Sequence, residues 1–127
     1  MRDIIATDQA PGAIGAYSQA VRAGDTVWIS GQIPLVPASM EVVKGGVRTQ
    51  IEQVFTNLEA IVRAAGGDLS QIVKLNVYLT DLADFPLVNE VMAERFDEPF
   101  PARAAVEVAG LPKAVSVEVE GVLYLGA

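Results

Sequence analysis

The sequence predicts an α/β (α+β) fold in which two helices cover one face of a mixed β-sheet. Its 127 residues match the length of one domain, residues 1–127, with a single core. Two segments place apolar side chains at the three- and four-residue steps of a helix, whereas the others alternate or are rich in β-formers. In chain order they give strand, strand, helix, strand, helix, strand, strand. Elements in this order bury their apolar sides by packing in layers.

The first two strands are expected at residues 17–22 and 27–32. Both runs are rich in β-forming side chains, and the turn-like sequence Ala23-Gly24-Asp25-Thr26 separates them. A short polar turn between two strand-like runs is typical of a β-hairpin.

The first helix is expected from Val47 to Ala65. The glycines at 66 and 67 follow it, and glycine tolerates the left-handed conformation that often ends a helix. Its start has two interpretations, a capping box formed by Thr49 and Glu52 or the glycine pair at 45 and 46. The apolar positions of its buried side are Ile51, Val54, Phe55, Leu58, Ile61, Val62 and Ala65.

The next strand and the second helix follow directly. Residues 72–80 alternate apolar and polar side chains, which is the period of a strand. Asp84 is the expected N-cap of the helix, and Pro86 lies in its first turn, where a missing N–H costs little. Pro99 and Pro101 mark its end. Its apolar stripe consists of Phe85, Val88, Met92 and Phe96.

The last two strands are expected to form a hairpin around the turn AGLPKA. If the valine faces of both strands pack beneath the helices, Ala105 pairs with Glu118, and Arg103 lies diagonal to Glu118. Glu120 shares that face. Two interpretations stay open, a solvated face with a surface ion pair or an anion-binding arginine beside a carboxylate base.

The last two predicted strands also contain several residues with small side chains. Ala102, Ala104, Ala105 and Gly121 make a poor solvent-facing sheet unless another subunit covers it. A covering subunit would turn this face into a cleft.

Composition excludes several kinds of chemistry. The chain has no cysteine and no histidine, so thiol nucleophiles, zinc–sulfur sites and an imidazole base are ruled out, and we expect no metal. The net charge is −7 and the basic residues are scattered, which disfavours nucleic acid as a partner. The sequence shows neither a membrane span nor a signal peptide, and a cytosolic (cytoplasmic) protein without membrane partners is the expectation.

Four motifs in order carry a resemblance to a known family. The segments GAYSQA (15–20), SGQIP (30–34), NLEAIVRAAGGDLSQIVKLNVYLTDLADFPLVNEV (57–91) and FPARAAVEVAGLPKAVSVEVEG (100–121) resemble the Rid family, the reactive intermediate deaminases also called YjgF or L-PSP. The resemblance implies a chorismate-mutase-like fold and a homotrimer with active sites in clefts between subunits. It also implies hydrolysis of enamines and imines, such as 2-aminoacrylate, to 2-oxo acids and ammonia without a cofactor.

The resemblance also implies site residues. Arg103 matches the arginine that grips the substrate carboxylate, and Glu118 matches the glutamate that holds or activates water, although Glu120 on the same face is an alternative. We expect both to come from one subunit, with further residues from its neighbour. The remaining substrate-binding positions are Tyr17, Ser30, Gly31, Asn89 and the backbone of Ala105.

Some of these positions have simpler interpretations. Tyr17 suits an interface aromatic, Ser30-Gly31 a turn, and Asn89 an exposed helix position. Many members have cysteine at the position of Ala105, so a thiol-based regulation is in doubt here.

Three functions remain open at this point. The first is a broad 2-iminobutanoate/2-iminopropanoate deaminase of the RidA-like branch. The second is a pathway-specific deaminase acting on another imine or an aminomuconate-type substrate. The third is a non-catalytic ligand-binding or protective trimer, or a ribonuclease-type relative, which the acidity and the retained Arg103 disfavour.

Overall fold

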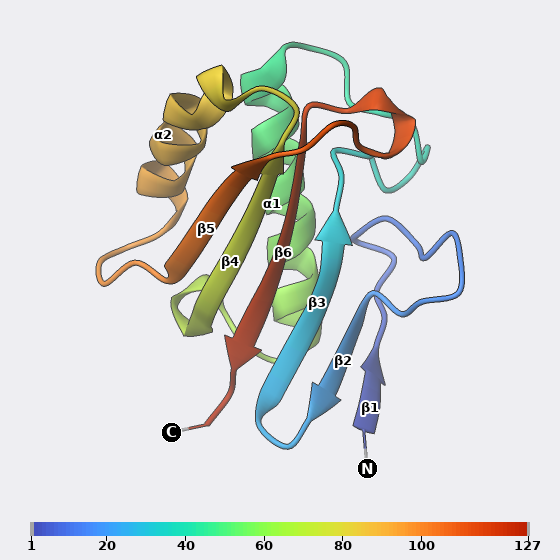
Figure 1. Ribbon diagram of the computed structural model, residues 1–127. Helices are drawn as coiled ribbons and strands as arrows, with labels where there is room; N and C mark the ends of the chain where they lie inside the picture. The colour runs from blue at the N-terminus through green and yellow to red at the C-terminus, as the bar shows by residue number, and fades with distance from the viewer. Residues whose placement is uncertain (1, 127) are drawn as a thin grey trace.

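The computed structural model describes residues 2–126, in which six strands form one sheet and two α-helices pack on it (Figure 1). The strands are β1 (Arg2–Ile5), β2 (Ala20–Ala23), β3 (Thr26–Gln32), β4 (Ile72–Leu79), β5 (Ala102–Glu107) and β6 (Val117–Tyr124). The helices are α1 (Val47–Ala64) and α2 (Phe85–Arg95), and three short 3-10 turns are η1 (Leu69–Gln71), η2 (Leu82–Asp84) and η3 (Pro112–Ala114).

The sheet has the strand order β1-β2-β3-β6-β4-β5. All neighbouring strands are antiparallel except β4 and β5, which are parallel. In Figure 1, α1 lies behind β4 and β6, and α2 lies beyond β5. The predicted α/β fold with both helices on one face of a mixed sheet is confirmed, and we call the uncovered side the open face.

The core lies between α1 and the sheet. Every apolar residue predicted for the buried side of α1 is indeed buried, Ile51 and Phe55 completely. Phe55 also packs edge-on against the ring of Phe96 after α2, with the centroids 5.8 Å apart. Gly46 is the N-cap of α1, and Gly66 follows its C-cap with a φ of +88°.

The first hairpin and the start of α2 also follow the sequence pattern. Ala23 pairs with Thr26, so β2 and β3 are joined by a two-residue turn in which Gly24 has a φ of +62°. Asp84 occupies the N-cap position of α2 but makes no side-chain cap, and the carboxylate of Asp81 instead accepts a hydrogen bond from the N–H of Ala83. The edge strand β1 was not expected.

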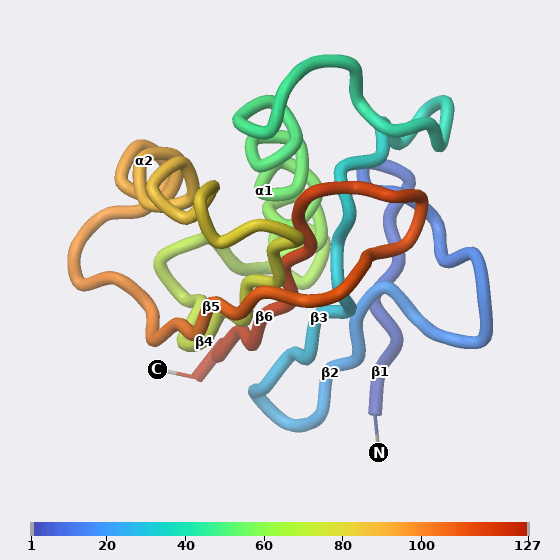
Figure 2. Tube along the Cα trace, turned by 45° about the horizontal axis from the view of Figure 1, so that its top comes forward, coloured from blue at the N-terminus to red at the C-terminus, as the bar shows by residue number. Residues whose placement is uncertain are grey.

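The predicted hairpin of the last two strands is wrong. β4 lies between β5 and β6, so Ala105 pairs with Val77 and Glu118 pairs with Tyr78. The physical reason is that α2 connects β4 to β5 as a crossover, which makes β5 parallel to β4 and brings it to the free edge of β4. β6 then occupies the space between β3 and β4. Residues 108–116 then extend toward β3 and return on the other side of β4, as Figure 2 shows.

The predicted faces of β5 are also wrong. Arg103 lies in register with the fully buried Leu75, so it points toward the helices, whereas Val106 is on the open face and 46% exposed. The Arg103 side chain fits at this edge because its apolar stem packs under α2 while the guanidinium reaches water. On β6 the prediction is correct, because Val117 and Val119 are fully buried beneath α1.

No helix within residues 2–126 combines the length and the apolar character that a bilayer crossing requires. The cytoplasmic location stays a prediction.

Candidate functional site

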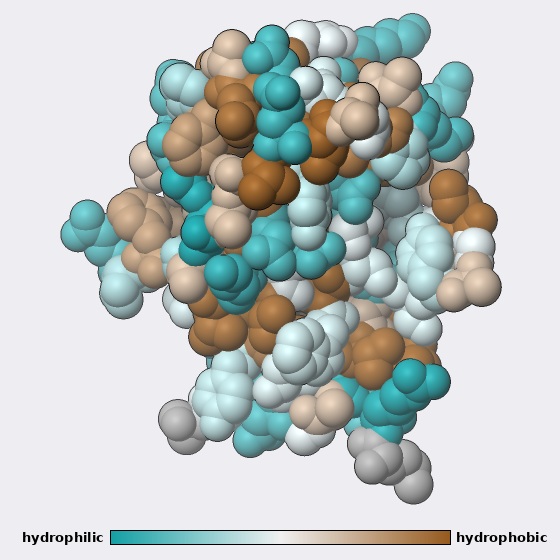
Figure 3. All heavy atoms as spheres, viewed as in Figure 1, coloured by the Kyte–Doolittle hydropathy of each residue, from teal (hydrophilic) through white to brown (hydrophobic). Residues whose placement is uncertain are grey.

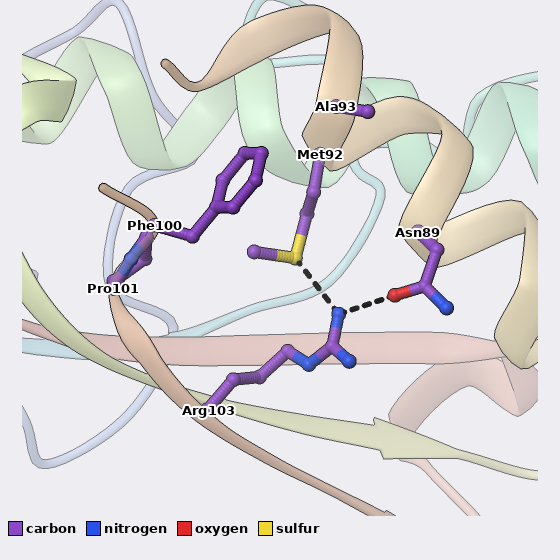
Figure 4. A pocket seen from close by; sticks show the side chains of 6 residues that line it. All are labelled: Asn89, Met92, Ala93, Phe100, Pro101 and Arg103. Carbon is purple, nitrogen blue, oxygen red and sulfur yellow. Dashed lines mark hydrogen bonds between the residues drawn. The ribbon is translucent and has the colours of Figure 1, made fainter. Parts of the chain in front are cut away.

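A cavity of about 370 Å³ opens between α2 and the start of β5 (Figure 4). Arg103 extends from β5 toward α2, and the side chains of Met92 and Phe100 stand above it. The cavity, which we call the arginine pocket, is lined by Asn89, Met92, Ala93, Phe100, Pro101 and Arg103. One cation in a mostly apolar wall is the usual composition of a site for a small charged ligand.

Three side chains of α2 hold the guanidinium of Arg103. Its Nη1 donates a hydrogen bond to Oδ1 of Asn89 at 2.6 Å and a longer one to Sδ of Met92 at 3.5 Å. Its Cζ lies 4.7 Å from the centroid of the Phe85 ring, a cation–π contact.

These contacts leave the charge of Arg103 without a counter-ion. No carboxylate of residues 2–126 lies within 4.0 Å of its guanidinium nitrogens, whereas Arg22, Arg48, Arg63 and Arg95 all pair with acidic side chains. A fixed, unpaired guanidinium is well suited to bind a carboxylate with its planar fork.

The predicted Asn89 and Ala105 lie close to Arg103 in the fold. Asn89 contacts it directly, and Ala105 follows two residues later on the same face of β5, where it packs against the core. From their spacing, Phe85 and Met92 were expected only in the apolar stripe of α2. Their contact with Arg103 became visible once the register placed that arginine beneath α2.

A second group of polar residues lies on the open face. Glu118 and Glu120 point away from the helices from β6, and Asn76 and Tyr78 flank them from β4. Nδ2 of Asn76 donates a hydrogen bond to Oε2 of Glu120 at 3.1 Å. Glu118 receives no side-chain hydrogen bond from the described residues.

The pKa values of Glu118 and Tyr78 are both shifted by their surroundings. Burial raises the pKa of the half-buried Glu118 carboxyl, and the negative charge of Glu120 raises it again. Burial also raises the pKa of Tyr78, as do the neighbouring Glu120 and Glu118, so its hydroxyl stays protonated. A carboxylate with a raised pKa and no fixed partner is suited to take a proton from water.

Three further predicted residues lie on β3 and on the loop that precedes β2. The carboxylate of Glu118 rests directly over the backbone of Gly31. Oγ of Ser30 donates a hydrogen bond to the carbonyl oxygen of Ser18 at 2.6 Å. Tyr17 is 49% exposed and shares with Gly31 the lining of a narrow groove under the loop of residues 11–19. We call Tyr17, Ser30, Gly31 and Glu118 the glutamate group.

The predicted site is therefore divided within one chain. Arg103 points to the helix side of β5, whereas Glu118 points to the open face of β6, and β4 separates the two strands. The prediction that Arg103 and Glu118 lie on one face of one subunit is wrong, because it depended on the hairpin that the sheet does not form. One chain therefore presents two separate groups, the arginine pocket and the glutamate group, which we call half-sites.

Potential metal ligands do not gather in either half-site. Residues 2–126 contain no group of three or more Asp, Glu, His or Cys side chains arranged to hold a metal ion. Independence from metals and cofactors stays a prediction.

The sequence and the fold of this chain are similar to those of known proteins. A sequence model described as endoribonuclease L-PSP matches residues 7–124. The 2-iminobutanoate/2-iminopropanoate deaminase of Homo sapiens is 47% identical over 126 residues, which cover 99% of this chain and 92% of that protein. The crystal structure of RidA from an Antarctic Psychrobacter has a TM-score of 0.93 at 55% identity, with 96% of this chain and 98% of that chain covered. The structure of E. coli TdcF with bound serine also has a TM-score of 0.93, at 43% identity and with 98% and 99% covered.

Proposed function

This chain belongs to the Rid (endoribonuclease L-PSP) family, and on that premise we propose that it is a deaminase of 2-imino acids and their enamine forms. Its substrates would be 2-iminobutanoate, 2-iminopropanoate and 2-aminoacrylate, and its products 2-oxo acids and ammonia. The observation that carries this proposal is the unpaired guanidinium of Arg103 in a pocket of about 370 Å³.

Arg103 binds the substrate carboxylate. A carboxylate is the feature shared by all these imines and by the serine bound to the related TdcF. The hydrogen bond to Asn89 and the ring of Phe85 fix the orientation of the fork before the substrate arrives. A preformed orientation reduces the entropy lost on binding and directs the imine carbon toward the attacking water.

Glu118 accepts a proton from the attacking water. The water oxygen forms a bond to C2 of the protonated imine, the electron pair of the C2=N bond moves to nitrogen, and Glu118 takes the proton. The protonated Glu118 then returns that proton to nitrogen, an oxygen electron pair forms the C2=O bond as the C–N bond breaks, and ammonia leaves. Glu118 takes the remaining hydroxyl proton, which gives the 2-oxo acid, and passes it to ammonia, which departs as ammonium. We assign this role to Glu118 instead of Glu120 because Asn76 already holds Glu120.

The two half-sites meet between subunits of a homotrimer. Since Arg103 and Glu118 lie on opposite sides of one sheet, we propose that Arg103 of one subunit faces the glutamate group of the next. This replaces the expectation that both come from one subunit. Tyr17 and Ser30 then line the substrate cleft across from Asn89 and the backbone of Ala105.

The open face supports such an assembly. Ile4 and Trp28 are each 55% exposed there, and Val106 and Tyr124 are each 46% exposed. Figure 3 shows apolar and weakly polar side chains spread over this face between the charged ones. Large apolar side chains on an uncovered sheet are typical of a face that another subunit covers.

A trapping competition tests the proposed function. A serine dehydratase releases 2-aminoacrylate in the presence of semicarbazide, which traps it, and the addition of this protein is expected to divert it to pyruvate and ammonia. The diversion should persist in a chelator. An unchanged semicarbazone yield at micromolar protein would contradict the proposal, and imines from several amino acids distinguish a broad enzyme from a pathway-specific one.

A further inference from the structure

We propose that Gly31 is a positioning residue for Glu118: the missing side chain at position 31 provides the space in which the Glu118 carboxylate is held. The inference rests on the proposed function of Glu118 and adds a residue that acts through it. Gly31 thus has a role beyond lining the substrate cleft.

The evidence is the space above Gly31. A Cβ at position 31 would lie 2.9 Å from Cδ and 3.2 Å from Cγ of Glu118, and closer still to Oε2. The end of the Glu118 side chain therefore occupies the volume that any other residue at position 31 would fill. Contacts of this kind also account for the half-burial of the carboxylate, which raises its pKa.

The backbone of β3 is fixed on the side opposite Glu118. The register of β3 against β6 shifts between Ile29 and Gln32, which places Ser30 and Gly31 in a bulge. The N–H of Ser30 donates to the carbonyl oxygen of Gln19 at 2.9 Å, and its Oγ donates to Ser18 at 2.6 Å. Because these bonds hold the bulge, a new Cβ displaces the carboxylate and not the strand.

A methyl group at position 31 meets no atom outside Glu118 closer than 3.2 Å. Gly31 does not have the left-handed backbone conformation of Gly24, Gly45 and Gly66, so no positive φ disfavours an alanine there. The three nearest atoms to the added Cβ all belong to the flexible end of Glu118. Gly31→Ala is therefore expected to fold and to move one carboxylate.

The experiment compares steady-state kinetics of Gly31→Ala with wild type, after the wild type has been shown to turn over imines. We expect kcat to fall at least about tenfold, because a misplacement near 1 Å costs up to about 100-fold. KM should stay within about twofold of wild type, because Arg103 holds the substrate from the other half-site. Gly110→Ala is the matched control, since a Cβ there meets no atom within 4 Å.

A crystal structure of Gly31→Ala supplies the second measurement. The Glu118 carboxylate should be displaced while β3 and β6 superpose on those of the wild type. A wild-type kcat, or a lowered kcat with the carboxylate in its original place, would overturn the inference. If the wild type itself does not hydrolyse imines, the proposed function fails, and the position of the carboxylate in the variant still decides whether Gly31 holds it.

Discussion

Within residues 2–126, the groups that hold the Arg103 guanidinium are all neutral, and this determines what its replacement should do. Asn89, Met92 and Phe85 orient the guanidinium without neutralising it. Arg103→Ala should lower imine turnover at least about 100-fold, because a charged hydrogen-bonded pair and the orientation of the imine are lost together. Arg103→Lys should recover only part, since an ammonium keeps the charge and loses the fork. Turnover by the semicarbazide competition measures both.

A surface arginine provides the control for this prediction. Arg22 pairs with Asp25 at 3.3 Å on the exposed first hairpin, so Arg22→Ala should leave turnover unchanged. If Arg103→Ala keeps its trimeric state and near wild-type turnover, the arginine is structural and the carboxylate assignment is wrong.

In the proposed mechanism, Glu118 connects catalysis with pH-dependent stability. Its raised folded pKa means that the folded protein binds this proton more tightly than the unfolded chain does. The free energy of unfolding therefore falls as the pH rises from the ordinary carboxyl pKa to the raised one, and stays lowered above it. Glu118→Gln removes this fall in the free energy of unfolding. The stability of the variant relative to wild type should therefore be higher at pH about 7 than at pH about 4.

The same variant should lose activity. Without the proton-accepting carboxylate, turnover is expected to fall at least about 100-fold. Urea unfolding at both pH values and the imine assay measure the two effects. If the difference in free energy of unfolding between the two pH values is the same in Glu118→Gln and in wild type, the folded protein does not raise the pKa of the Glu118 carboxyl.

At the scale of elements, local periodicity was sufficient to locate both helices and five of the six strands. α1 and β4 begin and end within one residue of the predicted ranges, because their patterns of buried side chains are complete within each segment. The pairing of β5 was missed for the opposite reason. Whether β5 pairs with β4 or with β6 depends on where α2 packs, and neither strand pattern contains that information.

The end of α1 gives a prediction at this scale. Gly66 has a φ of +88° and open space where a Cβ would lie, so Gly66→Ala changes backbone strain and nothing else. We expect a loss of about 1–2 kcal/mol per chain in the free energy of unfolding, the cost of a left-handed L-residue. Chemical denaturation measures it, with Gly110→Ala as the unstrained control. Equal stability of the two variants would contradict the cause given for this helix end.

The whole molecule is expected to be a trimer held partly by its open face. Trp28 is 55% exposed at the middle of β3, so Trp28→Glu should shift sedimentation toward monomers at micromolar concentration. Arg63→Glu places the same charge on the outer side of α1, where the arginine side chain is 66% exposed, and should leave the trimer intact. A Trp28→Glu protein that sediments as wild type would contradict a subunit contact at this position.

The division of the site was the part that the sequence could not supply. The motifs identified Arg103, Glu118, Gly31 and Asn89 as a group, because residue types and their order are visible in one dimension. The opposite orientations of Arg103 and Glu118 depend on β4 lying between their strands, which is a property of the assembled sheet. Composition alone was sufficient to exclude thiol and imidazole chemistry.

A site shared between subunits is tested most directly by mixing two inactive variants. Subunits of Arg103→Ala and Glu118→Gln are unfolded together, refolded as mixed trimers and verified by native mass spectrometry. The cleft is intact wherever the arginine pocket of a Glu118→Gln chain meets the glutamate group of an Arg103→Ala chain. In randomly mixed trimers this holds for about one cleft in four, so turnover should recover to about a quarter of the wild-type value. A mixture of Arg103→Ala with the Arg103→Ala/Glu118→Gln double variant contains no intact cleft and should stay inactive. Verified mixed trimers of the two single variants without recovered turnover would contradict a site formed by Arg103 of one subunit and Glu118 of the next.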